Sequence, residues 1–537
     1  MWKPKKRLGR KAKQPVRGIS PLRLRPRSAP PDSEAAGNTP RFPIVGLGAS
    51  AGGLEALQQF IGALGPSTGM AFVVITHQHP TSPTLLPEIL GKHADLPVLV
   101  IRDGAKVEPN KVYVAPPGPR VSLHSGRFHF EEAGEKLRGP LPIDHFFRSL
   151  AKDHREAAIG IVLSGTGSDG TLGIAEIKGA GGFVLAQDAD SARFAGMPTS
   201  AAATHLVDGL FKPEDMPQEL ARLLSRRAGP LTMPVLDTGA AVQRLLQTLR
   251  LRTGNDFTSY KKSTVLRRIE RRMNVRGFSD VHEYSLLLDS NHEEADILFR
   301  ELLISVTGFF RDPEVFEALR TELRAKFEKR DETPTFRAWV AACATGEEAY
   351  SLAIIMKELM SELGKNVAVQ IFATDLDPHA VDAARAGRYP LGISADVSPE
   401  RLERFFSKHE DEYRIKKEVR ELIVFAAQNV IKDPPFTRLD LVSCRNLLIY
   451  LEPELQRRVL SLFSYALQPD GLLLLGGSEN VSGTTTPSSA WTRRTSCSNA
   501  CAGGSNPLPS SRSPRTFLPA SGRRDRAEPI KTPEGSD

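Results

Sequence analysis

Short apolar runs, each followed by a small-residue turn and then by helical periodicity, recur along the chain. Apolar residues from Phe336 to Ala341 lead into a turn at Thr345–Gly346, and the apolar spacing becomes helical from Glu347. Phe42–Leu57 repeats this order near the start of the chain. Such patterns predict buried strands alternating with helices, so we expect a doubly wound α/β domain in each half. The free backbone N–H groups at each helix start make the turns candidate ligand sites.

Polar residues follow the strands predicted in the second half of the chain. The apolar run from Val369 ends in Asp375, and the run from Leu439 breaks into polar residues at Arg445 and Asn446. Ligands of open α/β sheets lie at the carboxyl ends of the strands, where an acidic residue can accept from both hydroxyls of a ribose. This spacing indicates an adenosine-containing cofactor. If the turn before Glu347 is considered alone, the alternative to a ligand site is an ordinary connection between a strand and a helix.

Five motifs occur in order: Thr307–Asp312, Ala342–Glu348, Ala373–Asp377, Cys444–Tyr450 and Gly476–Glu479. Together they resemble the chemotaxis receptor methyltransferase family, called CheR. The resemblance implies S-adenosylmethionine as cofactor, and it places Arg311 and Tyr450 nearest the carboxylate that is methylated. The cofactor-pocket residues that it implies are Thr307, Arg311, Glu347, Asp375, Asn429, Val430, Arg445 and Asn446. Ser305 stands where that family has asparagine.

A serine lies at the first small-residue turn, and a candidate base and acid follow later strands. Ser50 sits among glycines and alanines, His77 ends the apolar run from Ala71, and Asp169 lies in a glycine-rich turn. A serine nucleophile needs a base and an orienting acid, and small neighbours tolerate the sharp turn that exposes its hydroxyl. The alternative interpretation of this turn is a glycine loop that binds phosphate. For the general base, His79 is the alternative candidate to His77.

Three motifs resemble the catalytic domain of the chemotaxis methylesterase, called CheB: Gly48–Gly53, Ala71–His77 and Ser164–Gly170. The resemblance assigns Ser50 as nucleophile, His77 as general base and Asp169 as its orienting partner. Thr76 and Thr166 stand where that family often has glutamine and methionine. We expect no phosphorylated receiver domain before this one, so partner or substrate geometry would bias the two activities.

The composition is typical of a soluble globular protein, with 537 residues of which 40% are hydrophobic and 25% charged. No apolar run reaches the roughly 18 residues of a membrane span, and the N-terminus lacks the apolar core of a secretory signal, so we expect a cytoplasmic protein. The four cysteines lack zinc-site spacing, and we predict neither a metal site nor disulfides. They are Cys343, Cys444, Cys497 and Cys501.

The net charge of +8 is concentrated at the N-terminus. Residues 1–40 carry eleven Lys or Arg and two acids, so the rest of the chain is nearly neutral. This segment, rich in Pro, Gly and Ser, cannot bury enough apolar surface to fold, and we predict a disordered, solvated tail. Contact with nucleic acid or an anionic membrane is the alternative for the tail, but the near-neutral body argues against a nucleic-acid enzyme.

A basic helix is predicted at Tyr260–Met273, where arginines flank an apolar stripe: Arg267, Arg268, Arg271 and Arg272. A charged helix face is usually a solvated face. The functional alternative is that these arginines dock the acidic helices of a methyl-accepting receptor or a related signalling partner, with histidine kinase modules as further partners. The segment 390–424 resembles the small strand insertion with which the CheR family binds receptors.

The chain divides in order into six predicted segments. They are a disordered basic tail at 1–40, a CheB-type methylesterase domain at 41–228, a linker at 229–236, a helical CheR N-terminal domain at 237–303, a CheR-type methyltransferase domain at 304–483, and a disordered or frameshifted tail at 484–537. Because the resemblance stops at residue 483, we expect the methyltransferase sheet to lack its last strand.

The two resemblances imply a bifunctional signalling enzyme of chemotaxis type. It would methylate glutamate side chains of a protein and hydrolyse the resulting methyl esters, with glutamine deamidation as a further reaction. The alternatives are a scaffold that keeps both folds but has lost one activity, and a nucleotide-binding regulatory module without catalysis.

Overall fold

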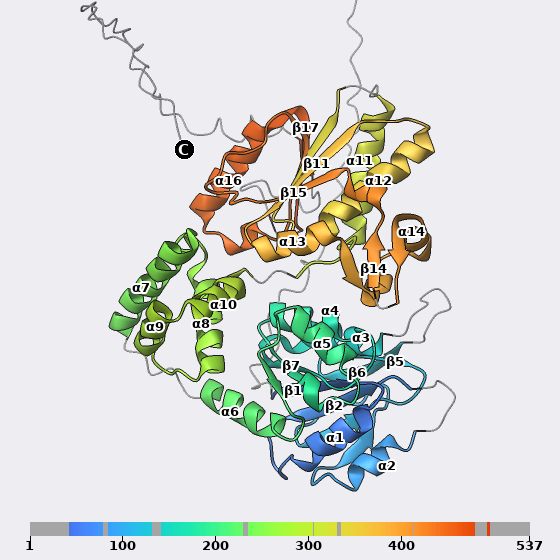
Figure 1. Ribbon diagram of the computed structural model, residues 1–537, viewed down its shortest axis with the longest axis vertical. Coiled ribbons are helices and arrows are strands. Elements are labelled where there is room, and N and C mark those ends of the chain that lie inside the picture. The colour runs from blue at the N-terminus through green and yellow to red at the C-terminus, as the bar shows by residue number, and fades with distance from the viewer. Residues whose placement is uncertain are drawn as a thin grey trace, which may run out of the picture.

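The computed structural model describes residues 42–78, 84–131, 141–228, 235–303, 306–329, 334–410, 412–477, 479 and 491–493. In these ranges the chain forms two α/β lobes and a group of helices (Figure 1). The predicted fold class, two doubly wound domains with a small helical domain between them, is confirmed. The tail at 1–40, most of 484–537, His79, Ser305, Cys497 and Cys501 lie outside the described residues.

The first lobe is built on a parallel seven-stranded sheet in the order β3-β4-β2-β1-β7-β8-β9. The strands are β1 (Ile44–Ala49), β2 (Ala71–Thr76), β3 (Val98–Val100), β4 (Lys111–Val114), β7 (Ala158–Val162), β8 (Phe183–Gln187) and β9 (Gly209–Phe211), and β5 (Arg120–His124) forms a separate hairpin with β6 (Arg127–Glu131). The helices are α1 (Gly53–Gly62), α2 (Leu86–Gly91), α3 (Pro142–His154), α4 (Thr171–Gly179), α5 (Gly196–Ala203) and α6 (Met216–Ala228). The strand order reverses between β1 and β7, which is where doubly wound sheets bind ligands.

Glycines of β1 allow α3 to approach the sheet closely. A Cβ at Gly46 would lie 2.7 Å from Phe147 Cε1, and one at Gly48 would lie 2.4 Å from Ile143 Cγ2. Real Cβ atoms do not approach this closely, so only glycine fits beneath α3 here. The first turn of α3 is thereby held at the carboxyl end of β1.

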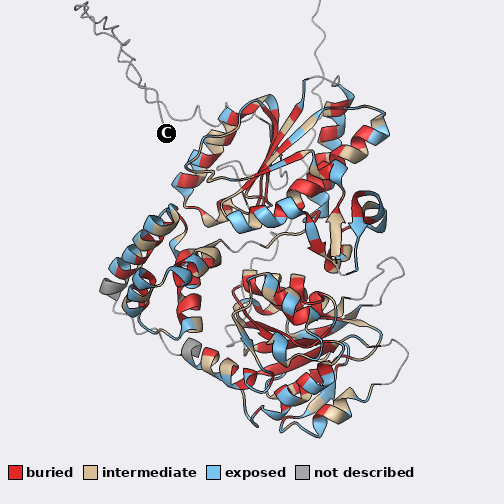
Figure 2. Cartoon of the chain, in the orientation of Figure 1, coloured by how far each residue is buried: buried red, intermediate tan, exposed pale blue. Residues whose placement is uncertain are grey.

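The helical group shares a core with the second lobe. It consists of α7 (Val235–Thr253), α8 (Lys262–Arg276), α9 (Val281–Ser290) and α10 (His292–Leu302). Tyr284 and Leu298 belong to one apolar cluster with Trp339 and Phe463 of the second lobe. Figure 2 shows that buried residues mark the central strands of both sheets and the inward helix faces.

The second lobe is built on a six-stranded sheet in the order β15-β11-β10-β16-β17-β18. Its strands are β10 (Phe336–Ala341), β11 (Val369–Asp375), β15 (Ile423–Ala427), β16 (Leu439–Cys444), β17 (Leu467–Leu475) and β18 (Trp491–Arg493). Its principal helices are α11 (Pro313–Glu328), α12 (Glu347–Leu363), α13 (Pro378–Ala386), α14 (Pro399–Phe405) and α16 (Pro453–Ala466). The strand order reverses between β10 and β16, so this lobe has the same kind of switch point as the first.

The prediction that this sheet lacks its last strand is wrong. β18 pairs antiparallel with β17, with Leu474 opposite Trp491 and Leu472 opposite Arg493. Only three residues pair, and they follow a stretch rich in Ser, Thr and Pro. Because such a composition is typical of disordered segments, it did not predict a strand here. A pairing partner in β17 decided the structure of this segment, as commonly happens for short edge strands.

A small antiparallel sheet is inserted after α13. It consists of β12 (Arg388–Pro390), β13 (Phe406–Lys408) and β14 (Glu412–Ile415). The predicted strand insertion is therefore present, but its far boundary is wrong. The run from Ile423 to Ala427 is β15 of the main sheet, where it pairs parallel with β11.

The basic helix α8 does not present a solvated cationic face. Arg268, Arg271 and Arg272 are 3%, 5% and 7% exposed, and of the four predicted arginines only Arg267 is half exposed. Arg271 donates to Asp208 of the first lobe at 2.5 Å and to Glu301 of α10 at 2.8 Å. The predicted docking of acidic receptor helices on these arginines is thus corrected, because their charges are satisfied inside the chain.

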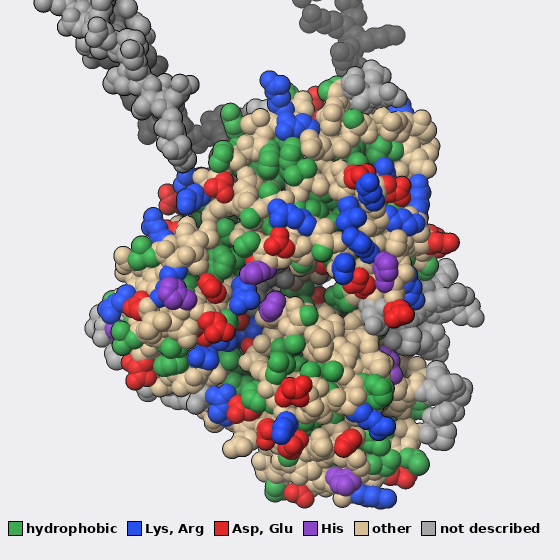
Figure 3. Space-filling model, in the orientation of Figure 1, with side chains coloured by type: hydrophobic (Ala, Val, Ile, Leu, Met, Phe, Trp, Pro, Cys, Tyr) green, Lys and Arg blue, Asp and Glu red, His purple; other side chains and the backbone are tan. Residues whose placement is uncertain are grey.

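The two lobes also contact each other directly. Arg148 of α3 donates to both carboxylate oxygens of Asp396, at 2.8 and 3.0 Å. Leu172 of α4 packs against the core of the second lobe, and Val275 of α8 packs against the core of the first. Figure 3 shows the lobes meeting around a hollow between them.

Candidate functional site

The ends of β1 and β2 bring Ser50 and His77 to neighbouring positions. The two strands run parallel with Ala49 opposite Thr76, so the residues that follow them lie beside each other at the carboxyl edge. Adjacent strands are roughly 4.8 Å apart, so the backbone at Ser50 and the backbone at His77 are neighbours at this edge. The Ser50 amide also donates to the carbonyl of Ser164, just after β7, at 3.0 Å.

Asp169 is buried behind His77. Its Oδ2 lies 3.2 Å from His77 Nε2, and its side chain is 2% exposed while that of His77 is 30% exposed. Three backbone amides donate to the Asp169 carboxylate, from Ile143 at 3.0 Å, Asp144 at 2.9 Å and Gly170 at 2.8 Å. These three hydrogen bonds fix the orientation of the carboxylate. The imidazole nitrogen that does not face Asp169, Nδ1, is left for the serine.

The segment before α5 forms the rim beside Ser50, and sequence reasoning missed it. A Cβ at Gly52 would lie 2.9 Å from Arg193 Cβ and from Phe194 Cδ2, and one at Gly165 would lie 2.9 Å from Ser50 Cβ. Phe194 is 40% exposed there. The segment has no periodicity or motif of its own, so only the fold places it at the site.

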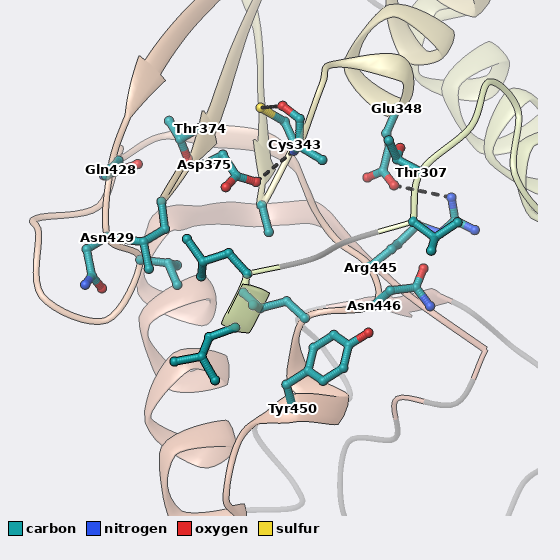
Figure 4. Close-up of a pocket in the computed structure, with 18 of the residues that line it drawn as sticks. Thr307, Cys343, Glu348, Thr374, Asp375, Gln428, Asn429, Arg445, Asn446 and Tyr450 are labelled. Carbon is teal, nitrogen blue, oxygen red and sulfur yellow. Dashed lines mark hydrogen bonds and ion pairs between the residues drawn. The ribbon is translucent and has the colours of Figure 1, made fainter. Parts of the chain in front are cut away.

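A cavity that is partly open to solvent lies at the carboxyl edge of the second sheet (Figure 4). The ends of four strands, β10, β11, β15 and β16, contribute to its wall. Of the predicted residues, those that line it are Thr307, Arg311, Asp375, Asn429, Val430, Arg445, Asn446 and Tyr450. Motifs spread over about 140 residues of the chain therefore meet in one concave site.

Asp375 ends β11 at the wall of the cavity. Its carboxylate accepts from the amides of Ala344 at 2.7 Å and Asp377 at 3.0 Å. Burial raises the pKa of Asp375 despite these amides. Each carboxylate oxygen has a further lone pair, so the group can still accept from a ligand's hydroxyls.

Arg445 and Glu348 form an ion pair inside the cavity wall (Figure 4). Arg445 Nη1 lies 3.3 Å from Glu348 Oε2, and Nη2 donates to Asp312 at 2.5 Å. The Arg445 side chain is 1% exposed, and its Nε is buried without a hydrogen-bond partner among the residues the structure describes. An unpartnered buried donor in a cavity wall suits a polar ligand.

Of the two glutamates at the start of α12, the structure places Glu348 in the cavity wall rather than Glu347, for which a cofactor contact was predicted. Successive helical residues point about 100° apart, so at the start of α12 only Glu348 faces the cavity. Glu347 is 7% exposed and accepts from the hydroxyl of Thr345 at 2.7 and 2.8 Å and from the side chain of Thr307. Burial raises the pKa of Glu347 to about 7. It supports Thr307 from behind the wall.

The helical group closes the cavity on the side opposite the strands, which the sequence did not indicate. Tyr260, Thr264 and Val265 of the α8 region and Leu302, Leu303 and Val306 line it. Burial, followed by the charge of Asp375, raises the pKa of Tyr260 to about 12. Asn429 donates to Asn255 at 2.9 Å and so fixes the helices to the strand edge. A ligand here would be enclosed between the strand ends and the helices of a preceding segment.

The hydrogen-bonding and apolar groups of the cavity wall suit S-adenosylmethionine. A carboxylate at the end of the second strand suits the ribose hydroxyls, and the turn after β10 has small residues, Ala342 and Ala344, at positive φ of 60° and 47°. The apolar helical wall and the buried Arg445 Nε suit the remaining apolar and polar parts of such a molecule. Within the described residues no cluster of three His, Cys, Asp or Glu side chains could hold a metal ion.

Comparison with known proteins agrees with this geometry. The class defined by the second lobe is that of an S-adenosylmethionine-dependent methyltransferase, and the first lobe has the strand-end Ser, His and Asp of a serine hydrolase. Three family models match: CheB methylesterase at residues 45–220, CheR methyltransferase all-alpha domain at 240–303, and CheR methyltransferase SAM binding domain at 305–496. The chain belongs to the CheR family of chemotaxis methyltransferases and carries a CheB methylesterase domain before it.

Individual relatives cover one or both parts. The chemotaxis protein methyltransferase of Salmonella typhimurium is 30% identical over 263 residues, which are 47% of this chain and 88% of that protein. An uncharacterized 104.1 kDa protein of Rhodobacter capsulatus is 39% identical over 419 residues, or 73% of this chain. This chain spans only 44% of that relative's length.

A solved structure resembles the first lobe. The CheB methylesterase catalytic domain of Thermotoga maritima is 28% identical and covers 34% of this chain and 99% of its own, with a TM-score of 0.32. The comparisons give no support for the predicted histidine kinase partners. None of the described helices has the length and apolar character needed to cross a membrane.

Proposed function

We propose that this chain methylates glutamate side chains of a protein and hydrolyses the resulting methyl esters. The observation that carries the proposal is that two distinct sites, each at the carboxyl edge of the parallel strands of its own sheet, lie in domains matched by CheB and CheR models. One polypeptide would add and remove the same mark. Each cycle would remove one negative charge from the substrate and then restore it.

In the esterase site, Ser50 Oγ would attack the ester carbonyl while His77 Nδ1 takes its proton. Asp169, held by its three amides, would keep the imidazole oriented and stabilise its positive charge. The tetrahedral intermediate would release methanol, which receives the proton from His77. Water, activated by His77, would then hydrolyse the acyl-Ser50 ester and restore both the glutamate carboxylate and the serine.

In the second site, S-adenosylmethionine supplies the methyl group together with its own leaving group, so the protein has only to bind, orient and exclude water. Asp375 would accept from the ribose hydroxyls, and the wall around Tyr260 and Val265 would keep water out. Arg311 and Tyr450 would hold the carboxylate that accepts the methyl group. Thr307, Asn429, Val430, Arg445 and Asn446 would complete the enclosure of the cofactor.

The substrate would be a methyl-accepting chemotaxis receptor or a related signalling protein that carries glutamates on acidic helices. Relatives whose names are chemotaxis protein methyltransferase support this choice. We assign receptor contact to the small sheet β12-β14-β13, because Arg268, Arg271 and Arg272 of α8 are buried.

Two measurements test the proposal. Titration calorimetry should show S-adenosylmethionine binding, and incubation with methyl-labelled cofactor should label a receptor fragment on glutamate. The same chain should then release methanol from the labelled fragment once cofactor is removed. Cofactor binding without label transfer would instead favour a scaffold that has lost its methyltransferase activity.

A further inference from the structure

The amides that hold Asp169 come mainly from another helix. Two of the three donors, the amides of Ile143 and Asp144, belong to the first turn of α3. The free N–H groups and positive dipole end of a helix start are well suited to a carboxylate. The orientation of Asp169, and through it of His77, therefore depends on where α3 begins.

The side chain of Asp144 joins α3 to α4. Its Oδ1 accepts from the amide of Gly173 at 2.6 Å, and the Leu172 amide also donates to this carboxyl. Asp169 lies just before α4, so Asp144 ties the segment that carries Asp169 to the helix that supplies its amides. Burial, followed by the neighbouring charge of Asp169, raises the pKa of Asp144 well above its usual range.

The second lobe packs onto this junction. The short helix η3 (Leu391–Ala395) brings Gly392 so close that a Cβ there would lie 2.9 Å from Asp144 Oδ2 and 2.8 Å from Leu172 Cδ1. Asp144 Oδ2 is buried and has no hydrogen-bond partner among the described residues, so it is confined by packing. The Arg148–Asp396 pair, one residue beyond η3, fixes the same two elements together.

We propose that Asp144 is a positioning residue for the esterase site, and that the methyltransferase domain holds it in place through Gly392. The methyltransferase domain is then a structural part of the esterase, although it contributes no group to the ester. This inference rests on the proposed esterase function and adds to it a dependence of esterase turnover on the contact between the lobes.

The test uses the full chain and compares Gly392→Ala with Gly239→Ala. Gly392 has no positive φ, so the added methyl group acts only on Asp144 and Leu172, whereas a Cβ at Gly239 meets nothing within 4 Å. We expect Gly392→Ala to lower kcat for a glutamate methyl ester peptide roughly tenfold or more with KM nearly unchanged, because small misplacements of catalytic groups are costly. Gly239→Ala should match the wild type, and S-adenosylmethionine binding should persist in both variants.

Variants at Asp144 separate positioning from folding. Asp144→Asn keeps the acceptor for the α4 amides and should retain most of the esterase activity, whereas Asp144→Ala should lose it to a similar or greater extent than Gly392→Ala. Labelling of Ser50 by a fluorophosphonate probe should follow the same order, because it reports activation of the serine without any ester substrate. Preserved S-adenosylmethionine binding and circular dichroism would show that each chain is folded.

The outcomes distinguish this inference from the proposed function. If the wild type hydrolyses the ester and labels at Ser50 but Gly392→Ala does both equally well, the second lobe plays no part and the inference is wrong. Equal loss in Asp144→Asn and Asp144→Ala would also overturn it. If the wild type hydrolyses no glutamate ester, the proposed function fails, and the order of fluorophosphonate labelling rates still decides the role of Asp144 and Gly392.

Discussion

The two candidate sites occupy the same position in their sheets but are enclosed differently. Ser50, His77 and Asp169 all follow strands of one sheet, and their mutual placement comes from strand register within a single lobe. The cofactor cavity has one wall of strand ends and one wall of helices from a preceding segment. The catalytic residues of the first site thus come from one sheet, whereas the cofactor cavity forms only when the helical segment packs against the strand ends of the second lobe.

The largest effect is expected for Ser50→Ala. Removing the nucleophile should lower ester hydrolysis by roughly 10³-fold or more, because groups of a catalytic triad act as a unit. Binding of S-adenosylmethionine should not change, since the site belongs to the other lobe. Ser67→Ala, at an exposed serine of the same lobe, is the matched control. Full hydrolysis by Ser50→Ala would show that the nucleophile lies elsewhere.

A second prediction concerns the link between the lobes. Arg271→Ala should lower the free energy of unfolding by about 3 kcal/mol, because it leaves the buried carboxylates of Asp208 and Glu301 with Lys178 as their main remaining cation. Arg267→Ala, on the same helix, should have little effect because its pair with Glu156 is about half exposed. Urea denaturation of both variants measures the difference. Equal stability of the two would restore the solvated-face interpretation of this helix.

Cofactor affinity should respond next most strongly. Asp375→Ala should weaken S-adenosylmethionine binding by roughly 10- to 100-fold, the usual loss for hydrogen bonds to a charged acceptor. Asp382→Ala should bind normally, since that side chain is 70% exposed on α13. Calorimetry gives both affinities, and hydrolysis of the ester should be the same in the two variants. An unchanged affinity in Asp375→Ala would contradict the ribose role.

The smallest effect is a pH dependence at Glu347. Its pKa is raised from 4.5 to about 7 in the folded chain. Between pH 4.5 and pH 7 the folded chain therefore holds a proton that the unfolded chain has released. The contribution to stability is full below this window and is lost as pH rises through about 7. Glu347→Gln should therefore raise Tm relative to the wild type at pH 8 more than at pH 5. Exposed Glu314→Gln should show no such difference, and equal Tm gains at both pH values would refute the shift.

Much of the fold could be predicted because its signals are local. Apolar runs that end at Ser50, His77, Asp375 and Arg445 fix where strands stop, and parallel strands collect those residues at one edge. The small strand β18 could not be predicted in this way. It depends on a partner in β17 rather than on its own composition.

The sequence by itself determined the two sheets, their turn motifs and eight of the residues that line the cofactor cavity, because periodicity and strand ends are properties of short segments. Only the tertiary structure decided that Glu348 rather than Glu347 faces the cavity, and that helices around Tyr260 close it. It alone placed Arg268, Arg271 and Arg272 of α8 inside the molecule and Gly392 against Asp144. These features depend on contacts between residues far apart in the chain. A row of arginines on an isolated helix indicates a solvent-exposed face, but in this protein most of these arginines are buried in ion pairs with distant carboxylates.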